Sequence, residues 1–115
     1  MEGRISYLDQ LLLQLADAAE RGALWVPIRD IHITPHNNSP NRHYRHVIRT
    51  VAAQVGLTYR LIDEKYVSSH KRQLRIKDKG IERLVYKGLM SRERAEEIRE
   101  RIKIASALSG EEGER

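Results

Sequence analysis

Four of the five histidines come in pairs whose spacing could hold a metal ion. His32 and His36 are four residues apart, and His43 and His46 are three apart. On a helix, either spacing places two imidazoles on one face, as a zinc site needs. However, the chain has no cysteine, no carboxylate lies among these histidines, and the neighbouring arginines would repel a cation. The sequence therefore predicts no metal site and no cofactor.

Two other groups contain side chains that take part in hydrolysis. Ser68 and Ser69 precede His70, but all three fall in a polar stretch that predicts a loop, which is a poor frame for a nucleophile. Histidine with arginine also occurs in enzymes that cleave phosphodiesters. No cluster of carboxylates accompanies them to hold a magnesium ion, and Asp30 alone is a weak candidate. We therefore predict that the protein is not an enzyme.

The strongest functional signal is the segment SPNRHYRHVIRTVAAQVG, residues 39–56. Ser39 as N-cap, Pro40 in the first turn and Gly56 as terminator predict a helix over 40–55. Steps of three and four residues predict an inward stripe made of Tyr44, Val47, Ile48, Val51, Ala52 and Val55. The remaining helix surface then carries Asn41, Arg42, Arg45, His46, Arg49 and Gln54. One side of the helix is expected to pack, and the other to be cationic.

The charge of the whole chain agrees with a cationic surface. There are 21 lysines and arginines and 16 aspartates and glutamates, a formal net charge of +5 that favours an anionic partner. Residues 42–79 contain ten lysines and arginines but only three aspartates and glutamates, so the positive charge is concentrated in the middle of the chain. Acidic residues interrupt the apolar residues of the N-terminal segment, so it has no long uncharged run. The segment is therefore predicted to be neither a signal peptide nor a membrane span. We expect a cytoplasmic protein that does not associate with membranes.

The elements before and after this helix must position it. Helical periodicity predicts a first helix from Ile5 to Ala19, capped by Ser6 and stopped by Gly22. ALWV (23–26) predicts a short edge strand, and PIRDIH (27–32) a short second helix that leads into the turn-rich connector ITPHNNSP. Alternation predicts two strands, LTYRLID (57–63) and QLRIK (73–77), joined by a long, mobile polar loop.

Two helices are predicted after the hairpin. Asp78 can cap the first, which Gly88 ends and whose inward residues are Ile81, Leu84 and Val85. Ser91 can cap the second, over 91–110, and residues 111–115 are expected to fray. The second helix carries a narrow apolar seam of Ala95, Ile98, Ile102 and Ala105. This seam predicts a homodimer interface, with packing against Leu8 and Leu12 of the same chain as the alternative.

The order of these elements, together with LRIKDKGIERL at 74–84, resembles the winged helix-turn-helix family of archaeal and bacterial transcriptional regulators. The resemblance covers about residues 5–90. It implies an α+β domain over 1–90 with a helical core and a small antiparallel β-hairpin wing, followed by a C-terminal helix over 91–110. It also implies that residues 40–55 are the recognition helix and residues 63–72 the wing tip. The long connector before the cationic helix departs from the compact turn of the family.

We therefore predict a sequence-specific transcriptional regulator that binds duplex DNA, in preference to RNA, as a homodimer. The predicted DNA contacts are Asn41, Arg42, Arg45, His46, Arg49, Lys71, Arg72, Arg75 and Lys77. The helix arginines are expected to donate to guanine edges or phosphates, and the cations of the wing (63–77) to follow the backbone. Three alternatives stay open: an RNA-binding or ribosome-associated protein, a virion protein that coats nucleic acid without reading it, and a cationic surface without a ligand.

Overall fold

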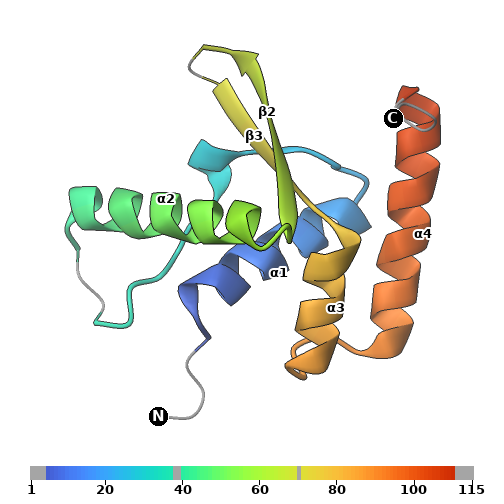
Figure 1. The fold of residues 1–115 in the computed structure, drawn as a ribbon, viewed down its shortest axis with the longest axis horizontal. Helices are drawn as coiled ribbons and strands as arrows, with labels where there is room; N and C mark the ends of the chain where they lie inside the picture. The colour runs from blue at the N-terminus through green and yellow to red at the C-terminus, as the bar shows by residue number, and fades with distance from the viewer. Residues whose placement is uncertain (1–4, 38–39, 70, 111–115) are drawn as a thin grey trace.

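The computed structural model describes residues 5–37, 40–69 and 71–110 (Figure 1). Within these ranges the chain forms four α-helices, one 3-10 helix and a small three-stranded antiparallel sheet, so the predicted α+β class is confirmed. In chain order the elements are α1 (Tyr7–Glu20), β1 (Val26–Pro27), η1 (Ile28–Asp30), α2 (Arg42–Thr58), β2 (Ile62–Ser68), β3 (Lys71–Ile76), α3 (Asp78–Tyr86) and α4 (Arg92–Ser109). The strand order is β1-β3-β2. The predicted frayed tail, 111–115, lies outside the described residues.

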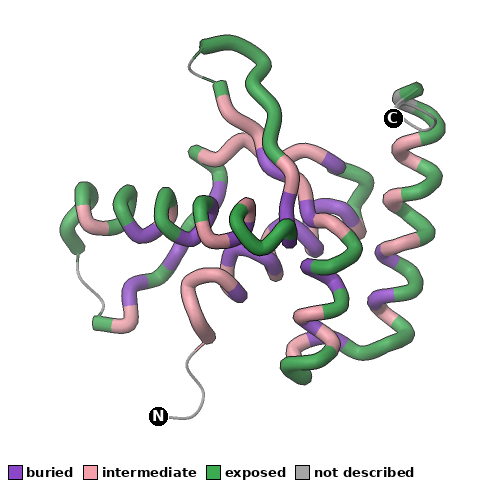
Figure 2. The backbone as a smooth tube through the Cα atoms, in the orientation of Figure 1, coloured by how far each residue is buried: buried purple, intermediate pink, exposed green. Residues whose placement is uncertain are grey.

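Helix α1 is the centre of the core, because it packs against β3, α2, α3 and α4. It starts where the sequence predicts: the Ser6 hydroxyl accepts a hydrogen bond from the backbone N–H of Asp9 at 3.0 Å. Gly22 follows its end with φ 94°, in the left-handed region that glycine adopts easily. Its fully buried leucines are Leu11, Leu12 and Leu15. Figure 2 shows that the buried backbone gathers on α1 and on the parts of the other elements nearest to it.

Two glutamines of α1 hold the segment that follows η1. The Gln14 side chain donates to the carbonyl of His32 at 2.7 Å and accepts from the N–H of His32 at 3.0 Å. Gln10 makes the same pair of bonds with Thr34, at 3.1 and 2.8 Å. The glutamines thus satisfy an extended backbone in the way a neighbouring strand would. The residues that alternate with His32 and Thr34 are buried: Ile31, Ile33 and Pro35.

The predicted short second helix over 27–32 is confirmed only in part, because η1 is a 3-10 helix of three residues and the chain is extended from Ile31. The backbone that would continue the helix is extended instead, since its N–H and C=O groups bond to the side chains of α1. Burial at every second residue also needs an extended chain rather than a helix. A long connector consequently takes the place that a second helix has in a helix-turn-helix.

Helix α2 begins and ends later than predicted. Asn41 is its N-cap, and the Asn41 side-chain oxygen accepts from the backbone N–H of Tyr44 at 3.0 Å. Ser39, the predicted cap, lies outside the described residues. The helix continues through Gly56, which is buried against Ile62, so residues 57 and 58 are helical rather than part of a strand. The turn into β2 follows at Arg60, the only described residue other than glycine with a positive φ.

The strands of the β2–β3 hairpin lie closer to its tip than predicted, because β2 begins at Ile62 rather than at residue 57 and β3 begins at Lys71 rather than at residue 73. Their register runs from Ile62 opposite Ile76 to Ser68 opposite Lys71, with an irregularity between Tyr66 and Ser68. Most of the predicted polar loop is therefore strand, and the tip is reduced to residues 69 and 70, of which His70 lies outside the described residues. Only the base of the hairpin is buried, so it projects beyond the core (Figure 2).

The last two helices pack on α1 within the same chain. Lys77, not Asp78, is the N-cap of α3, and the Asp78 carboxylate pairs with Arg99 of α4 instead. The predicted cap of α4 is confirmed: Ser91 accepts from the N–H of Arg94 at 3.1 Å. The Arg94 guanidinium bonds to the α1 carboxylates of Asp17 and Glu20. Helix α4 is thereby fixed to α1.

This packing corrects the predicted dimer seam. Ala95 and Ile98 are 1% and 0% exposed and belong to the core cluster of α1, so they offer no surface to a second chain. Ile102 packs partly against the same cluster, and Ala105 is half-buried. The apolar leucine side chains of α1 must be buried, and the nearest apolar residues of α4 pack against them.

The close packing of α3 makes one glycine sensitive to substitution. We expect Gly80→Ala to lower the free energy of unfolding by about 2 kcal/mol. A methyl group at Gly80 would lie 2.5 Å from the Leu61 carbonyl oxygen and 2.9 Å from Cγ1 of Ile76. That carbonyl is held by the N–H of Lys77 at 2.9 Å, so backbone has to shift. Urea denaturation followed by circular dichroism measures the loss.

Gly56→Ala is the matched control. A methyl group there would lie 3.1 Å from Cδ1 of Ile62, the mobile end of a side chain. Alanine in a helix interior gains about 0.5–1 kcal/mol over glycine, so we expect a net change of under about 0.5 kcal/mol. Equal losses from the two substitutions would contradict the packing of α3 against Leu61.

Candidate nucleic-acid interface

Helix α2 is rotated relative to the sequence prediction. Its buried residues are Ile48, Ala52, Ala53 and Gly56. Val47 and Val51, predicted to face inward, are 38% and 54% exposed. Ala52, Ala53 and Gly56 are small, so this side of the helix can approach its neighbours closely. Packing through the larger valines would keep the helix further from them. The predicted inward stripe is therefore confirmed at Ile48 and Ala52 and wrong at Val47 and Val51.

The outward face of α2 is uncharged. The exposed positions that recur along it at steps of three and four residues are His43, Val47, Thr50 and Gln54. No aspartate or glutamate occurs anywhere on the helix. Sequence reasoning missed this face because it placed two of the valines in the core. The run of small residues at 52, 53 and 56 was the signal that could have located the packed side.

The arginines of α2 lie on a different side of the helix from this face, and they line a groove. The groove has a volume of about 360 Å³ and runs between the connector and the first half of α2. Its lining residues are Ile31, His32, Ile33, Arg42, His43, Arg45, His46 and Arg49. The helix thus brings together four of its predicted contacts, Arg42, Arg45, His46 and Arg49. Asn41 is used as the N-cap.

Arg49 ties α2 to the connector. Its Nη1 donates to the carbonyls of Arg29 and Ile31 at 3.4 and 3.3 Å, and its Nη2 donates to Nδ1 of His46 at 3.2 Å. The Nε of Arg49 is buried and has no hydrogen-bond partner in the described part of the chain. The Arg49 guanidinium is therefore turned toward the connector rather than away from the helix, as a contact to a guanine edge would need.

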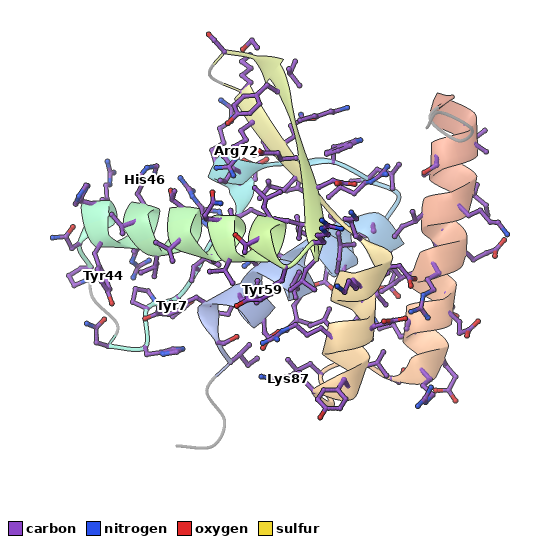
Figure 3. All side chains as sticks on the ribbon, in the orientation of Figure 1. Tyr7, Tyr44, His46, Tyr59, Arg72 and Lys87 are labelled. Carbon is purple, nitrogen blue, oxygen red and sulfur yellow. The ribbon has the colours of Figure 1, made fainter. Side chains whose placement is uncertain are left out.

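The predicted cations of the wing do not share one surface. Strand alternation places Arg72 on the side of Leu74 and Ile76, where its Nε is 2.6 Å from a carboxylate oxygen of Glu64. Lys71, Arg75 and Lys77 lie on the opposite side of the sheet. In the view of Figure 3, Arg72 and His46 both lie in the corner between the hairpin and α2.

The outer side of the sheet carries an aromatic residue that the sequence prediction did not use. The Trp25 ring has Nζ of Lys65 at 4.5 Å from its centroid and the Arg75 guanidinium carbon at 5.0 Å. Nζ of Lys77 lies 3.7 Å from an Asp63 carboxylate oxygen on the same side. These contacts hold the cations at the base of the hairpin, whereas Lys71 is exposed near its tip.

The fold separates His32 from His36, whereas His43 and His46 both line the groove. His36 lies against Tyr7, with ring centroids 4.4 Å apart, and its Nε2 is 3.0 Å from the carbonyl oxygen of Ile5. His32 lines the groove instead. Tyr7 also reaches Tyr44 (Figure 3), and this hydrogen bond raises the pKa of Tyr44. No group of three histidines or carboxylates among the described residues is placed to hold a metal ion.

The interface therefore consists of an uncharged outward face on α2, a cationic groove beside that face, and a projecting hairpin. None of the helices in the described ranges is both long and apolar enough to cross a membrane. When the chain was compared with protein families, curated proteins and solved structures, none of the three comparisons found a match.

Proposed function

We propose that the protein binds duplex DNA by placing α2 in the major groove, and that it acts as a transcriptional regulator of winged-helix type. One observation carries the proposal: α2 exposes a face without carboxylates whose side chains suit base edges, and arginines of the same helix line a groove on another of its sides. An α-helix fits the major groove, and neutral polar or apolar side chains read base edges there while arginines bind phosphates.

The residue types of the outward face have defined partners on DNA. The Gln54 amide can bond twice to adenine, and Val47 can contact the methyl group of thymine. The Thr50 hydroxyl donates to the carbonyl of His46 at 2.9 Å, so its lone pairs are left to accept from a base amino group. We therefore assign base reading to this face and phosphate contacts to the arginines, for which the sequence prediction left guanine edges and phosphates open.

The hairpin supports the winged-helix part of the proposal. The strand order β1-β3-β2 places the hairpin at one end of the core, from which it projects (Figure 1). Lys71 near the tip is exposed and suited to a phosphate of the adjacent backbone. A homodimer on DNA would use the distal part of α4, because Ile104 and Leu108 are 50% and 83% exposed whereas Ile98 is buried.

Substitutions on the two sides of α2 are expected to have different effects. Gln54→Ala should lose discrimination at one base pair, about tenfold, while binding other sequences normally. Arg42→Ala should weaken all duplexes alike and lower the slope of log affinity against log salt by about one. Fluorescence anisotropy against a preferred site, selected from random duplexes, and against scrambled duplexes measures both effects.

Arg92→Ala is the matched control, because Arg92 is the exposed first residue of α4 as Arg42 is of α2. It should leave DNA affinity nearly unchanged. Sequence-independent losses of equal size from Gln54→Ala and Arg42→Ala would contradict base reading by α2. Stronger competition by structured RNA than by duplex DNA would favour the RNA-binding alternative.

A further inference from the structure

We infer that the groove between residues 31–33 and α2 is a binding site for a phosphate group. The inference rests on the proposed function for one source of that group, a backbone phosphate of DNA. A free phosphomonoester has the same chemistry and is the other source. The groove holds three arginines and three histidines, and no carboxylate is among its lining residues.

The floor of the groove carries a positive charge that no described carboxylate neutralises. Arg49 is held by two backbone carbonyls and an imidazole nitrogen, and its Nε, one of the two N–H donors left over, is buried without a partner among the described residues. Elsewhere in the described chain, Arg72, Arg83, Arg94 and Arg99 each have a carboxylate. A partly buried cation without a counter-charge is costly in free energy, and a bound anion offsets that cost.

The hydrogen bond between Arg49 and His46 also prepares a donor for an anion. A guanidinium can only donate, so Nδ1 of His46 must accept, and the hydrogen of the neutral imidazole is then on Nε2. His46 can therefore donate from Nε2 without being protonated. Figure 3 shows His46 on the edge of α2 that faces the hairpin.

The rim of the groove adds donors from two separate parts of the chain. Arg42 and Arg45 come from α2, whereas His32 comes from the connector that Gln14 holds in place. Guanidinium groups bind phosphate oxygens through paired, charge-assisted hydrogen bonds. Because both walls are fixed to α1, one directly and one through a glutamine, the donors converge before a ligand arrives.

Titration with sodium phosphate, followed in amide nitrogen–proton correlation spectra, tests the site. We expect phosphate to shift the amide signals of residues 31–33 and 42–49, and sodium chloride of equal ionic strength to leave them in place. Arg49→Gln keeps a donor for the carbonyls but removes the charge, and it should weaken phosphate binding about tenfold. Arg45→Ala, at the rim, replaces it if Arg49→Gln does not fold. Arg92→Ala should bind phosphate as the wild type does.

The same variants with duplex DNA separate the two sources. If phosphate shifts the groove signals and Arg49→Gln weakens DNA binding as well, the site takes a backbone phosphate. If phosphate binds but duplex DNA does not, the groove stands as a phosphomonoester site and the proposed function fails. If DNA binds while phosphate and chloride give the same shifts, or if Arg49→Gln binds phosphate as the wild type does, the groove inference is overturned and the proposed function is unaffected.

Discussion

Replacing Ile98 with glutamate is expected to unfold the chain. Ile98 is 0% exposed and lies in the core cluster with Leu11 and Leu12 of α1. The substitution removes a buried apolar side chain and puts a carboxylate in its place without a partner, which we expect to cost more than about 4 kcal/mol. Because a small domain has only about 5–15 kcal/mol of net stability, a loss of this size removes much of that stability and unfolds a chain at the lower end of the range. Circular dichroism and thermal denaturation measure the effect.

Ile104→Glu is the control on the same helix, since Ile104 is 50% exposed. It should leave the melting temperature nearly unchanged, because surface substitutions usually alter stability by under about 0.5 kcal/mol. Sedimentation of this variant also tests the dimer proposed for the distal part of α4. If the wild type sediments as a dimer, Ile104→Glu should sediment as a monomer. A folded Ile98→Glu chain with native melting behaviour would show that α4 does not pack on α1.

Asp9→Ala is expected to lower the free energy of unfolding by about 3 kcal/mol, because breaking a buried ion pair leaves its partner uncompensated. The Asp9 carboxylate is 1% exposed and accepts from Nε of Arg83 at 2.8 Å and from Nη2 at 3.2 Å. Nζ of Lys87 lies 3.4 Å from Oδ2 of the same carboxylate. Arg83 and Lys87 are partly exposed, so water can solvate them once the carboxylate is removed. The expected loss of unfolding free energy is therefore at the lower end of the range for buried ion pairs.

The destabilisation should also depend on pH. Burial raises the pKa of Asp9, but hydrogen bonds from Arg83 and Ser6 and the charges of Arg83 and Lys87 outweigh it, and the pKa is lowered from 3.8. A carboxyl group with a lowered pKa stabilises the fold above its unfolded pKa, and this contribution is lost as the pH falls through the folded pKa. The difference between wild type and Asp9→Ala should therefore be full near neutral pH and shrink below about pH 4.

Asp63→Ala removes a carboxylate from an exposed pair and is the control. Asp63 is 44% exposed at its side chain, and its partner Lys77 is 39% exposed. Exposed pairs of this kind contribute under about 1 kcal/mol, so we expect a small change. Urea denaturation at neutral and acidic pH gives both comparisons. Equal losses for the two variants at neutral pH would mean that the Asp9 carboxylate is solvated.

Local signals in the sequence predicted the parts of the fold that depend on neighbouring residues. Ser6 and Ser91 cap helices as expected, because a cap and the N–H it accepts from are three residues apart. The start of α3 was missed by one residue, since Asp78 pairs with Arg99, 21 residues further along. The ends of the hairpin strands were missed because polar residues at 64–66 bond to a partner strand rather than forming a loop.

The candidate interface depended on contacts that are distant in the sequence. Arg49 looked available for DNA, but the carbonyls it binds are 18 and 20 residues away along the chain. The side of α2 that packs is decided by how closely α1 approaches, and valines at 47 and 51 are equally compatible with an exposed surface. The cationic character of residues 42–49 was readable from the sequence, but the direction in which each side chain points was not.

The glutamine contacts of α1 constrain how the connector can change in length. Gln10 and Gln14 each bind both the N–H and the C=O of one connector residue, and Ile33 between those residues points into the core. A single inserted or deleted residue before His32 would exchange the inward and outward positions of the whole segment. Ordinary surface loops tolerate such length changes. In this protein, length variation is instead compatible with the fold only beyond His36, whose backbone N–H and ring still contact Tyr7 of α1.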